Sequence, residues 1–175
     1  MKTVGIASLV TKTTKKKQKQ MKKKILNWLQ EFVEQPHPKL GNWAPCPYAR
    51  AARINDQIVI RQGTNALIDF EGIDLDLKEV YVFWYPLEKY TGERFAEITK
   101  VLNEALMPMD IVVLQDHPDL VEHVNGVHMN FGEASLHVIQ KLSKLNEAAD
   151  KLERQGYYKH WSQEELDEVK TWRYK

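Results

Sequence analysis

The chain has 175 residues, with 25 lysines and arginines against 24 aspartates and glutamates, one cysteine and a formal net charge of +1 at pH 7. This length suits a single domain, residues 1–175, that buries roughly two thirds of the surface of its unfolded chain. One cysteine excludes an internal disulfide, and no apolar run approaches the roughly 20 residues of a membrane-spanning helix. We therefore expect a soluble, cytoplasmic protein that is not associated with a membrane.

The small net charge hides an uneven distribution. Residues 1–24 contain nine lysines and no acidic residue, so this part carries +9 and the remainder carries −8. The basic segment 11–24 leads into the first predicted helix, and Lys15–Lys24 is a candidate surface for nucleic acid or an acidic partner. The alternative is an ordinary solvated helix face. No arginine or aromatic residue interrupts the lysines, which gives no support for bidentate phosphate contacts or base stacking.

The first predicted elements are a short strand at residues 4–10 and an amphipathic helix over about residues 16–35. The apolar residues of the helix follow the three-and-four spacing of one face: Met21, Ile25, Trp28, Leu29, Phe32 and Val33. The helix ends before Pro36, because a residue that precedes proline is disfavoured in the helical conformation. A short helix is expected over residues 47–53, with Pro47 at its first position and Cys46 as its N-cap.

Three further strands are expected at residues 57–61, 80–85 and 110–115. The β-branched and aromatic run at 80–85 indicates a strand that is buried on both faces. A helix that begins after Thr91 and ends before Pro108 connects it to the strand at 110–115, so these two strands are predicted to be parallel neighbours.

The C-terminal part is predicted to be helical. A long helix is expected from about Ser135 to Gln155, and Gly156 suits the position that follows its end. Ser162, with a glutamate three residues later, predicts a capping box at the start of a final short helix.

Together these elements predict an α+β or α/β domain. It contains a small mixed sheet of about four strands, at residues 4–10, 57–61, 80–85 and 110–115, packed with three main helices. A ferredoxin-like arrangement is the first expectation and a small three-layer sandwich is the second.

Cys46 is the first candidate functional residue. At a helix N-terminus, free backbone N–H groups and the helix dipole stabilise a thiolate. Arg50 and Arg53 lie on the same short helix, with Trp43 and Tyr48 beside it, so this helix is also a candidate site for a small anionic ligand. The alternative is that Cys46 is only a small buried apolar residue.

A polar segment at the carboxyl end of the strand 110–115 supplies the other candidates, because open α/β sheets bind ligands there. They are Asp116, His117, Asp119, His123, His128, Asn130 and His137. In one interpretation, His117 or His137 is the base that deprotonates Cys46, and an aspartate, best Asp119, orients the imidazole. In another, some of His117, His123, His128 and His137, with a carboxylate, hold a divalent metal, and His117, His123 and His128 are the first choice. The spacing of these histidines matches no standard ligand signature. In the third, the segment is an ordinary hydrogen-bonded loop. Asn130, in the same segment, is a candidate ligand-binding residue.

Several segments share their order and spacing with a known family. A tryptophan-leucine helix at residues 25–33 precedes Cys46-Pro47-Tyr48-Ala49, then Asp116-His117-Pro118-Asp119, then Ser135-Leu136-His137. Over about residues 25–145 the chain thus resembles an uncharacterised bacterial family, domain of unknown function 1415, which carries Cys-Pro-Phe-Ala, His-Pro-Asp and Leu-His motifs. The resemblance implies no known activity and points to Cys46, Pro47, Ala49, His117, Pro118, Asp119 and His137. Gln140 stands where the family pattern has an arginine, which weakens any anion pocket built on that arginine.

We therefore expect a small enzyme or small-molecule-binding protein in which Cys46, His117 and His137 share a pocket. In this hypothesis Cys46 is the nucleophile or redox thiol and His117 is its base. The rival hypothesis is a non-catalytic protein that uses the lysine-rich first helix to contact nucleic acid or an acidic partner. No phosphate loop, dinucleotide fingerprint or serine-hydrolase elbow is present. The sequence leaves the cofactor and the oligomeric state unknown.

Overall fold

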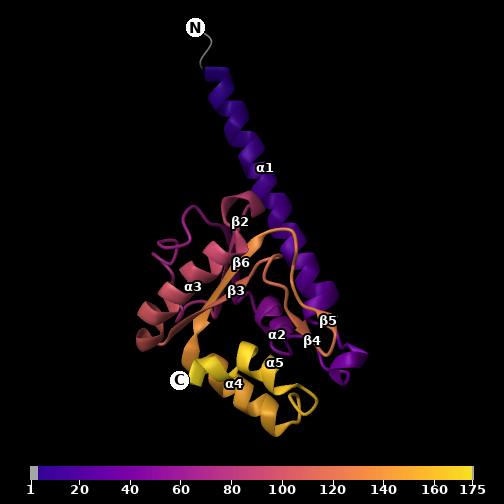
Figure 1. Ribbon diagram of the computed structural model, residues 1–175. Coiled ribbons are helices and arrows are strands. Elements are labelled where there is room, and N and C mark those ends of the chain that lie inside the picture. The colour runs from indigo at the N-terminus through magenta and orange to yellow at the C-terminus, as the bar shows by residue number, and fades with distance from the viewer. Residues whose placement is uncertain (1–3, 175) are drawn as a thin grey trace.

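The computed structural model describes the backbone of residues 4–174 and the side chains of residues 13–174. It shows an α+β structure with a four-stranded mixed sheet and a separate two-stranded hairpin (Figure 1). The first helix, α1, spans Val4–Trp28 and continues into one π-helical turn at Leu29–Val33. None of the helices within these described residues is long and apolar enough to cross a membrane.

The sheet has the strand order β1-β2-β6-β3. In that order the strands are Ile58–Gln62, Val80–Tyr85, Ser135–Lys141 and Ile111–Asp116. β1 runs parallel to β2, whereas β6 is antiparallel to both β2 and β3. β6 is therefore hydrogen-bonded on both sides, and β2 and β3 run in the same direction without touching.

The helix α3 (Gly92–Leu106) connects β2 to β3 in a βαβ unit that β6 splits. The prediction that β2 and β3 are neighbours is wrong, because β6 occupies the place between them. The order of β2, β6 and β3 matches that part of a ferredoxin-like sheet. The other edge of the sheet is formed by β1, which precedes β2 in the chain and runs parallel to it.

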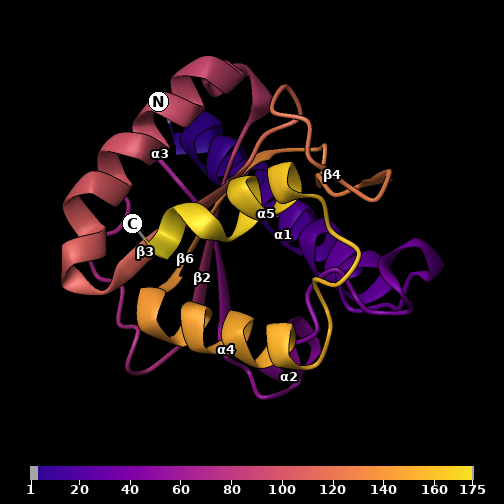
Figure 2. The ribbon, with the colours of Figure 1, turned by 60° about the horizontal axis from the view of Figure 1, so that its bottom comes forward.

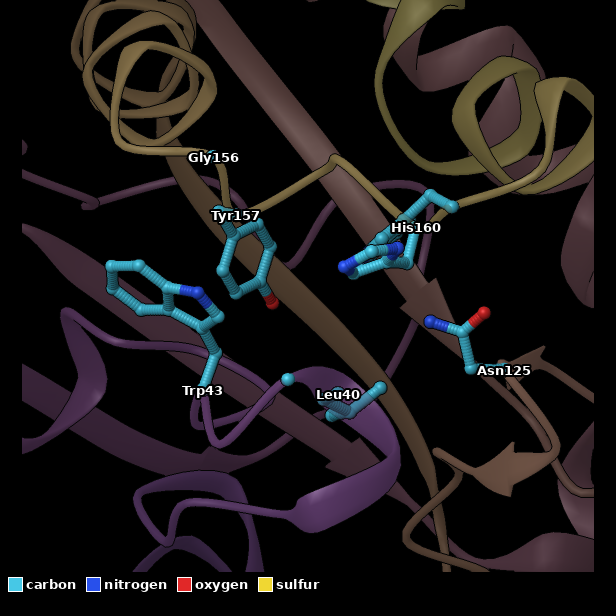
Figure 3. A pocket seen from close by; sticks show the side chains of 8 residues that line it. Leu40, Trp43, Asn125, Gly156, Tyr157 and His160 are labelled. Atoms are coloured by element: carbon cyan, nitrogen blue, oxygen red, sulfur yellow. The ribbon is translucent and has the colours of Figure 1, made fainter.

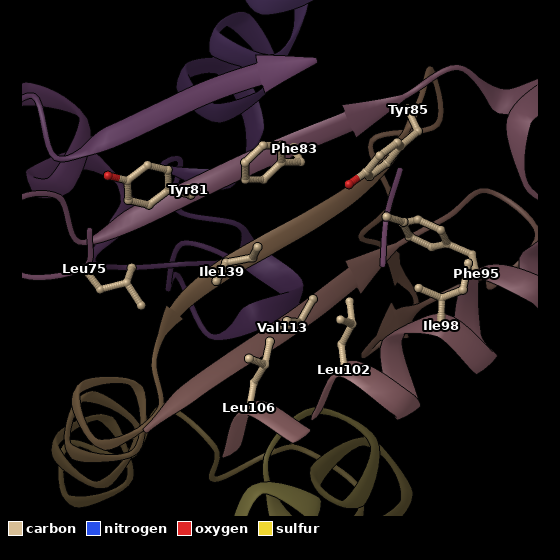
Figure 4. Packing of buried hydrophobic residues seen from close by; sticks show 11 residues of the cluster. Leu75, Tyr81, Phe83, Tyr85, Phe95, Ile98, Leu102, Leu106, Val113 and Ile139 are labelled. Atoms are coloured by element: carbon tan, nitrogen blue, oxygen red, sulfur yellow. The ribbon is translucent and has the colours of Figure 1, made fainter. Parts of the chain in front are cut away.

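The larger core lies between the sheet and α3 (Figure 4). Its central members come from β2, β3, β6 and α3: Phe83, Tyr85, Val113, Ile139, Phe95, Ile98 and Leu102. Successive residues of a strand point to opposite faces of the sheet, so every strand supplies this core with alternate side chains. Thr91 caps α3 as predicted, because its side chain accepts a hydrogen bond from the N–H of Arg94 at 3.2 Å.

The opposite face of the sheet packs against the last turns of α1. The buried residues there include Ile25, Leu29, Val33, Val82, Trp84 and Leu136. Trp84 pairs with Leu136, and Val82 pairs with Val138, so this face of β2 and β6 is apolar. The N-terminal part of α1 continues beyond the sheet, and residues 13–20 are all exposed (Figure 1).

The other elements are short or C-terminal. The helix α4 follows β6 and lies at the end of the sheet at which β6 terminates, whereas α5 crosses in front of the sheet beside α1 (Figure 2). There Glu165 of α5 accepts a hydrogen bond from the Asn125 N–H of the β4–β5 turn. The remaining bounds are α2 Ala49–Ile54, β4 His123–Val124, β5 Val127–His128, α4 Leu142–Arg154 and α5 Gln163–Val169. Single turns of 3-10 helix occupy Pro38–Leu40, Leu87–Lys89, Met107–Met109 and Thr171–Tyr174.

In two segments the predicted secondary structure is wrong, because a helix stands where a strand was predicted and a strand where a helix was predicted. Residues 4–10, predicted as a strand, are part of α1. Ser135–Lys141, predicted as the start of a long helix, is the strand β6, and the helix begins only at Leu142. The sheet thus has four strands, as expected, but its fourth strand is β6 instead of residues 4–10.

Two capping features predicted for the C-terminal helices are confirmed. Gly156 comes directly after the end of α4 and has a φ of 85°, a conformation that favours glycine. Ser162 and Glu165 form the predicted capping box at the start of α5.

Asn103 of α3 covers the open edge of β3. Its Nδ2 donates a hydrogen bond to the carbonyl oxygen of Val113 at 2.9 Å, and its Oδ1 accepts one from the Val113 N–H at 2.8 Å. Asn103 is 8% exposed, so these bonds are shielded from water. An edge strand presents unpaired backbone groups, and this side-chain amide satisfies one residue of that edge.

We expect Asn103→Leu to lower the free energy of unfolding by about 2–4 kcal/mol, because two buried backbone groups lose their partners. Urea denaturation measures the change. The exposed Glu104→Ala on the same helix is the control, and it should alter stability by less than about 0.5 kcal/mol. Equal stability of Asn103→Leu and wild type would contradict this role.

Candidate functional site

Cys46 lies before α2 rather than at its N-cap. The helix α2 begins at Ala49, and its N-cap is Tyr48, so the predicted positions of Pro47 and Cys46 are wrong. The backbone N–H of Cys46 donates to the carbonyl oxygen of Val33 at 3.0 Å, which ties the residue to the end of the π-helical turn.

The surroundings of Cys46 do not activate its thiol. The residue is exposed, yet the atoms packed around it desolvate the thiol and raise its pKa above the ordinary value. The Glu34 carboxylate also raises this pKa, while hydrogen bonds from the backbone of Tyr48 and Ala49 act in the opposite direction. A thiol with a raised pKa is mostly protonated at neutral pH and is a weak nucleophile.

His137 is buried inside the α3-side core. It is 1% exposed, and its ring stacks on Phe95 with the centroids 4.2 Å apart. Its Nε2 lies 2.9 Å from the Thr99 hydroxyl. That hydroxyl donates to the carbonyl of Phe95, so it accepts from Nε2, which carries the proton. Burial lowers the pKa of His137 to about 3, so the ring stays neutral across the physiological range.

His117 organises the loop that follows β3. The ring is 2% exposed; Nδ1 accepts a hydrogen bond from the Asp119 N–H at 3.1 Å, and Nε2 lies 3.0 Å from the carbonyl oxygen of Tyr90. Asn130 closes the same loop, because its Nδ2 donates to the carbonyl oxygens of His117 and Leu120. Because both ring nitrogens of His117 make contacts with the backbone, the structure supports a structural role for this histidine.

The sheet separates two of the predicted partners. His137 belongs to the α3 side with Phe95, whereas Cys46 is bonded to Val33, a member of the cluster on the α1 side. The structure therefore does not bring Cys46, His117 and His137 into one pocket. The geometry required for proton transfer from the thiol to one of these rings is missing.

One arginine of the predicted anion site, Arg53, is engaged in an ion pair. Arg53 binds Glu34 through two hydrogen bonds, Nε to Oε1 at 2.6 Å and Nη2 to Oε2 at 2.8 Å. Glu34 is 8% exposed, so this bidentate pair joins α2 to the end of the π-helical turn. Arg50 and Tyr48 are exposed.

Trp43 lines a small cavity of about 80 Å³ (Figure 3). Its ring packs edge-on against Tyr157, with the centroids 5.6 Å apart. The hydroxyl of Tyr157 donates to the carbonyl oxygen of Pro45 at 2.7 Å. The C-terminal segment thereby fixes the proline-rich approach to Cys46, which gives Trp43 a packing role.

The three histidines considered for metal binding are not gathered. His117 is buried in the loop, while His123 and His128 are exposed and face each other across the β4–β5 hairpin, 5.2 Å apart between ring centroids. Within the described residues, no group of three His, Cys, Asp or Glu side chains is arranged to hold a metal ion.

A larger concave feature is an open groove of about 910 Å³ on the α1 side of the sheet, which extends around the edge strand β3. The sheet contributes Leu114, Leu136 and Val138. Aromatic side chains come from α1, its π-helical turn and the C-terminal region: Trp28, Phe32, Trp161 and Trp172. Cys46 also lines this groove, rather than a pocket shared with His117 and His137.

Carboxyl groups supply the charge of the groove. The charged residues that line it are Lys100, Glu104, Asp116, Glu122 and Glu168. Burial raises the pKa of Asp116 above its ordinary value. Burial, together with the nearby charges of Asp116 and Glu168, raises the pKa of Glu122 to about 7. A carboxyl group with this pKa changes its charge at neutral pH.

One carboxylate oxygen in the groove has no partner. Asp116 Oδ2 accepts a hydrogen bond from the Phe131 N–H at 3.0 Å, whereas its buried Oδ1 has none within the described residues. The sequence predicted the importance of the end of β3, including Asp116. The sequence analysis did not predict Glu122 or Glu168 as site residues. The position of Glu122 in the same polar loop as Asp116 was the one sequence feature that pointed to it.

Comparison with known proteins found no match among family models, curated proteins or solved structures. The resemblance to domain of unknown function 1415 therefore remains an interpretation of the sequence.

We expect alkylation of Cys46 by iodoacetamide to have a midpoint above pH 8.5, the ordinary value of a thiol, because desolvation raises its pKa. The measurement is the alkylation rate against pH. His117→Ala should leave the midpoint unchanged, whereas Glu34→Gln should shift it to lower pH by removing a nearby negative charge. A midpoint below 8.5 in wild type that rises in His117→Ala would contradict this assignment.

Proposed function

We propose that the protein binds a small amphipathic ligand with a positively charged, hydrogen-bond-donating group in the groove beside β3 and β6. The observation that carries this proposal is the carboxyl pair Asp116 and Glu122, placed in a groove with aromatic walls. The proposal keeps the small-molecule pocket expected from the sequence. It moves the polar centre of that pocket from the histidines to two carboxyl groups.

The charge of the groove supports a cationic ligand. Four of its five charged lining residues are acidic, and Lys100 is the exception. The aromatic rings, among them Trp28 and Trp172, suit an apolar or aromatic ligand body and also attract a cation placed over their faces. Ligand sites commonly combine such apolar walls with a few converging polar groups.

Asp116 supports the binding of a hydrogen-bond donor. Its Oδ2 is fixed by the Phe131 N–H, and its Oδ1 is buried without a partner among the described residues. A buried acceptor without a hydrogen bond is costly, so a donor that reaches Oδ1 gains more than it would at an exposed carboxylate.

Glu122 gives the groove a proton-transfer group. A carboxyl whose pKa is about 7 accepts or donates a proton near neutral pH, which suits general acid–base catalysis. If the bound molecule is a substrate, Glu122 is the residue suited to move its proton. Cys46 then lines the groove as a protonated thiol rather than as the nucleophile.

Two probes of similar size and opposite charge test this proposal: tryptamine, which is a cation, and indole-3-propionate, which is an anion. We expect tryptamine to bind and to shift the NMR signals of Leu136 and Val138, whereas indole-3-propionate should bind at least tenfold more weakly. Tryptamine affinity should rise between pH 6 and pH 8, because Glu122 loses its proton over that range.

Glu122→Gln and Asp116→Asn should each weaken tryptamine binding about tenfold, and Glu122→Gln should also remove the pH dependence. Glu71→Gln, an exposed carboxyl that does not line the groove, is the matched control and should bind as wild type does. Equal affinity for the two probes, or shifted signals only outside the groove, would contradict the proposal.

A further inference from the structure

Most of the described lysines of α1 lie on one face of the helix, whereas Lys17 and Lys24 lie on the opposite side. At 3.6 residues per turn, five of them fall within about 120° of its circumference. These five, called the lysine face from here on, are Lys15, Lys16, Lys19, Lys22 and Lys23. Met21 and Ile25, which pack against the sheet, occupy the opposite side of the helix.

The lysine face is open to solvent. Its five residues are exposed, and α1 carries them away from the sheet (Figure 1). Lys24, which lies off this face, pairs with Glu133. Within residues 13–174, by contrast, the five lysines of the face make no ion pair of their own.

The spacing of these lysines is unfavourable without a partner. Lys15 and Lys19, like Lys19 and Lys23, are four residues apart, and like charges at this spacing destabilise a helix by tenths of a kcal/mol per pair. A bound polyanion removes this repulsion, because it places a negative charge beside each ammonium group.

We propose that the lysine face binds the phosphate backbone of double-stranded nucleic acid without reading its sequence. From Lys15 to Lys23 the face is about 12 Å long, and a duplex presents one charge per about 1.7 Å of its axis, so several phosphates lie within reach. Lysine contacts phosphate as a point charge. The absence of arginine and aromatic side chains from the face fits backbone contacts rather than base contacts.

Other polyanionic partners fit this face less well. A helix that binds a membrane inserts apolar side chains between lipids, whereas residues 13–20 are all lysine, threonine or glutamine. Among the described side chains, the apolar ones of α1 from Met21 onward pack on the sheet. Protein interfaces rely on aromatic and arginine anchors, which this face lacks. The inference is independent of the ligand groove, which lies at the other end of α1.

Fluorescence anisotropy with the full chain and a fluorescein-labelled 20-base-pair DNA duplex tests the inference. We expect two duplexes of unrelated sequence to bind equally. A plot of the logarithm of affinity against that of salt concentration should have a slope of about −4, since each contacted phosphate contributes about −0.9.

Two variants of equal charge separate this face from overall charge. The first replaces the five lysines of the face with glutamine, and we expect at least tenfold weaker binding and a slope closer to zero than −1. The second makes five exposed substitutions elsewhere, and it should bind within about twofold of wild type: Lys39→Gln, Lys89→Gln, Lys144→Gln, Lys151→Gln and Lys159→Gln. Circular dichroism checks that both variants keep the helix content of wild type.

Three results would overturn the inference. One is the absence of duplex binding by wild type at 50 mM salt. Another is equal loss of binding in both variants, which would assign the effect to total charge. The third is binding to phosphatidylserine vesicles through the same lysines with no binding to the duplex, which would assign the face to a membrane surface.

Discussion

The strand β6 lies in the middle of the sheet, between β2 and β3, and its pairing on both sides determines which side chains reach each layer. This strand is hydrogen-bonded to β2 on one side and to β3 on the other, so its register is fixed and its side chains alternate strictly between two layers. His137 and Ile139 enter the core below α3, while Leu136 and Val138 form the floor of the groove. The side chains of β6 are thereby divided between the core and the groove.

This separation explains why the chemistry of the groove comes from carboxyl groups. The buried histidines serve the fold: His137 stacks in the core and His117 holds the loop after β3. That loop in turn places Glu122 close to Asp116, where burial and mutual repulsion raise its pKa. Cys46 reaches the groove through its bond to Val33, but its surroundings keep the thiol protonated.

Much of the fold follows from local patterns in the sequence. The aromatic run of β2, the Thr91 cap of α3 and the capping box at Ser162 were all predicted, because each depends on neighbouring residues. The segment 135–141 was not, since Leu136, Ile139 and Leu142 have helical spacing while the same stretch also alternates as a strand. Pairing on both sides decides in favour of the strand. The site was less predictable, because Asp116 and Glu168 are far apart in the chain and meet only through tertiary packing.

The sheet places Cys46 on the groove side and His137 on the other. A nitroxide attached to Cys46, followed by NMR line broadening of methyl groups, tests it most directly. We expect stronger broadening of Leu136 and Val138, which line the groove with Cys46, than of Ile139 and Ile98 in the opposite core. Equal or stronger broadening of Ile139 would contradict it.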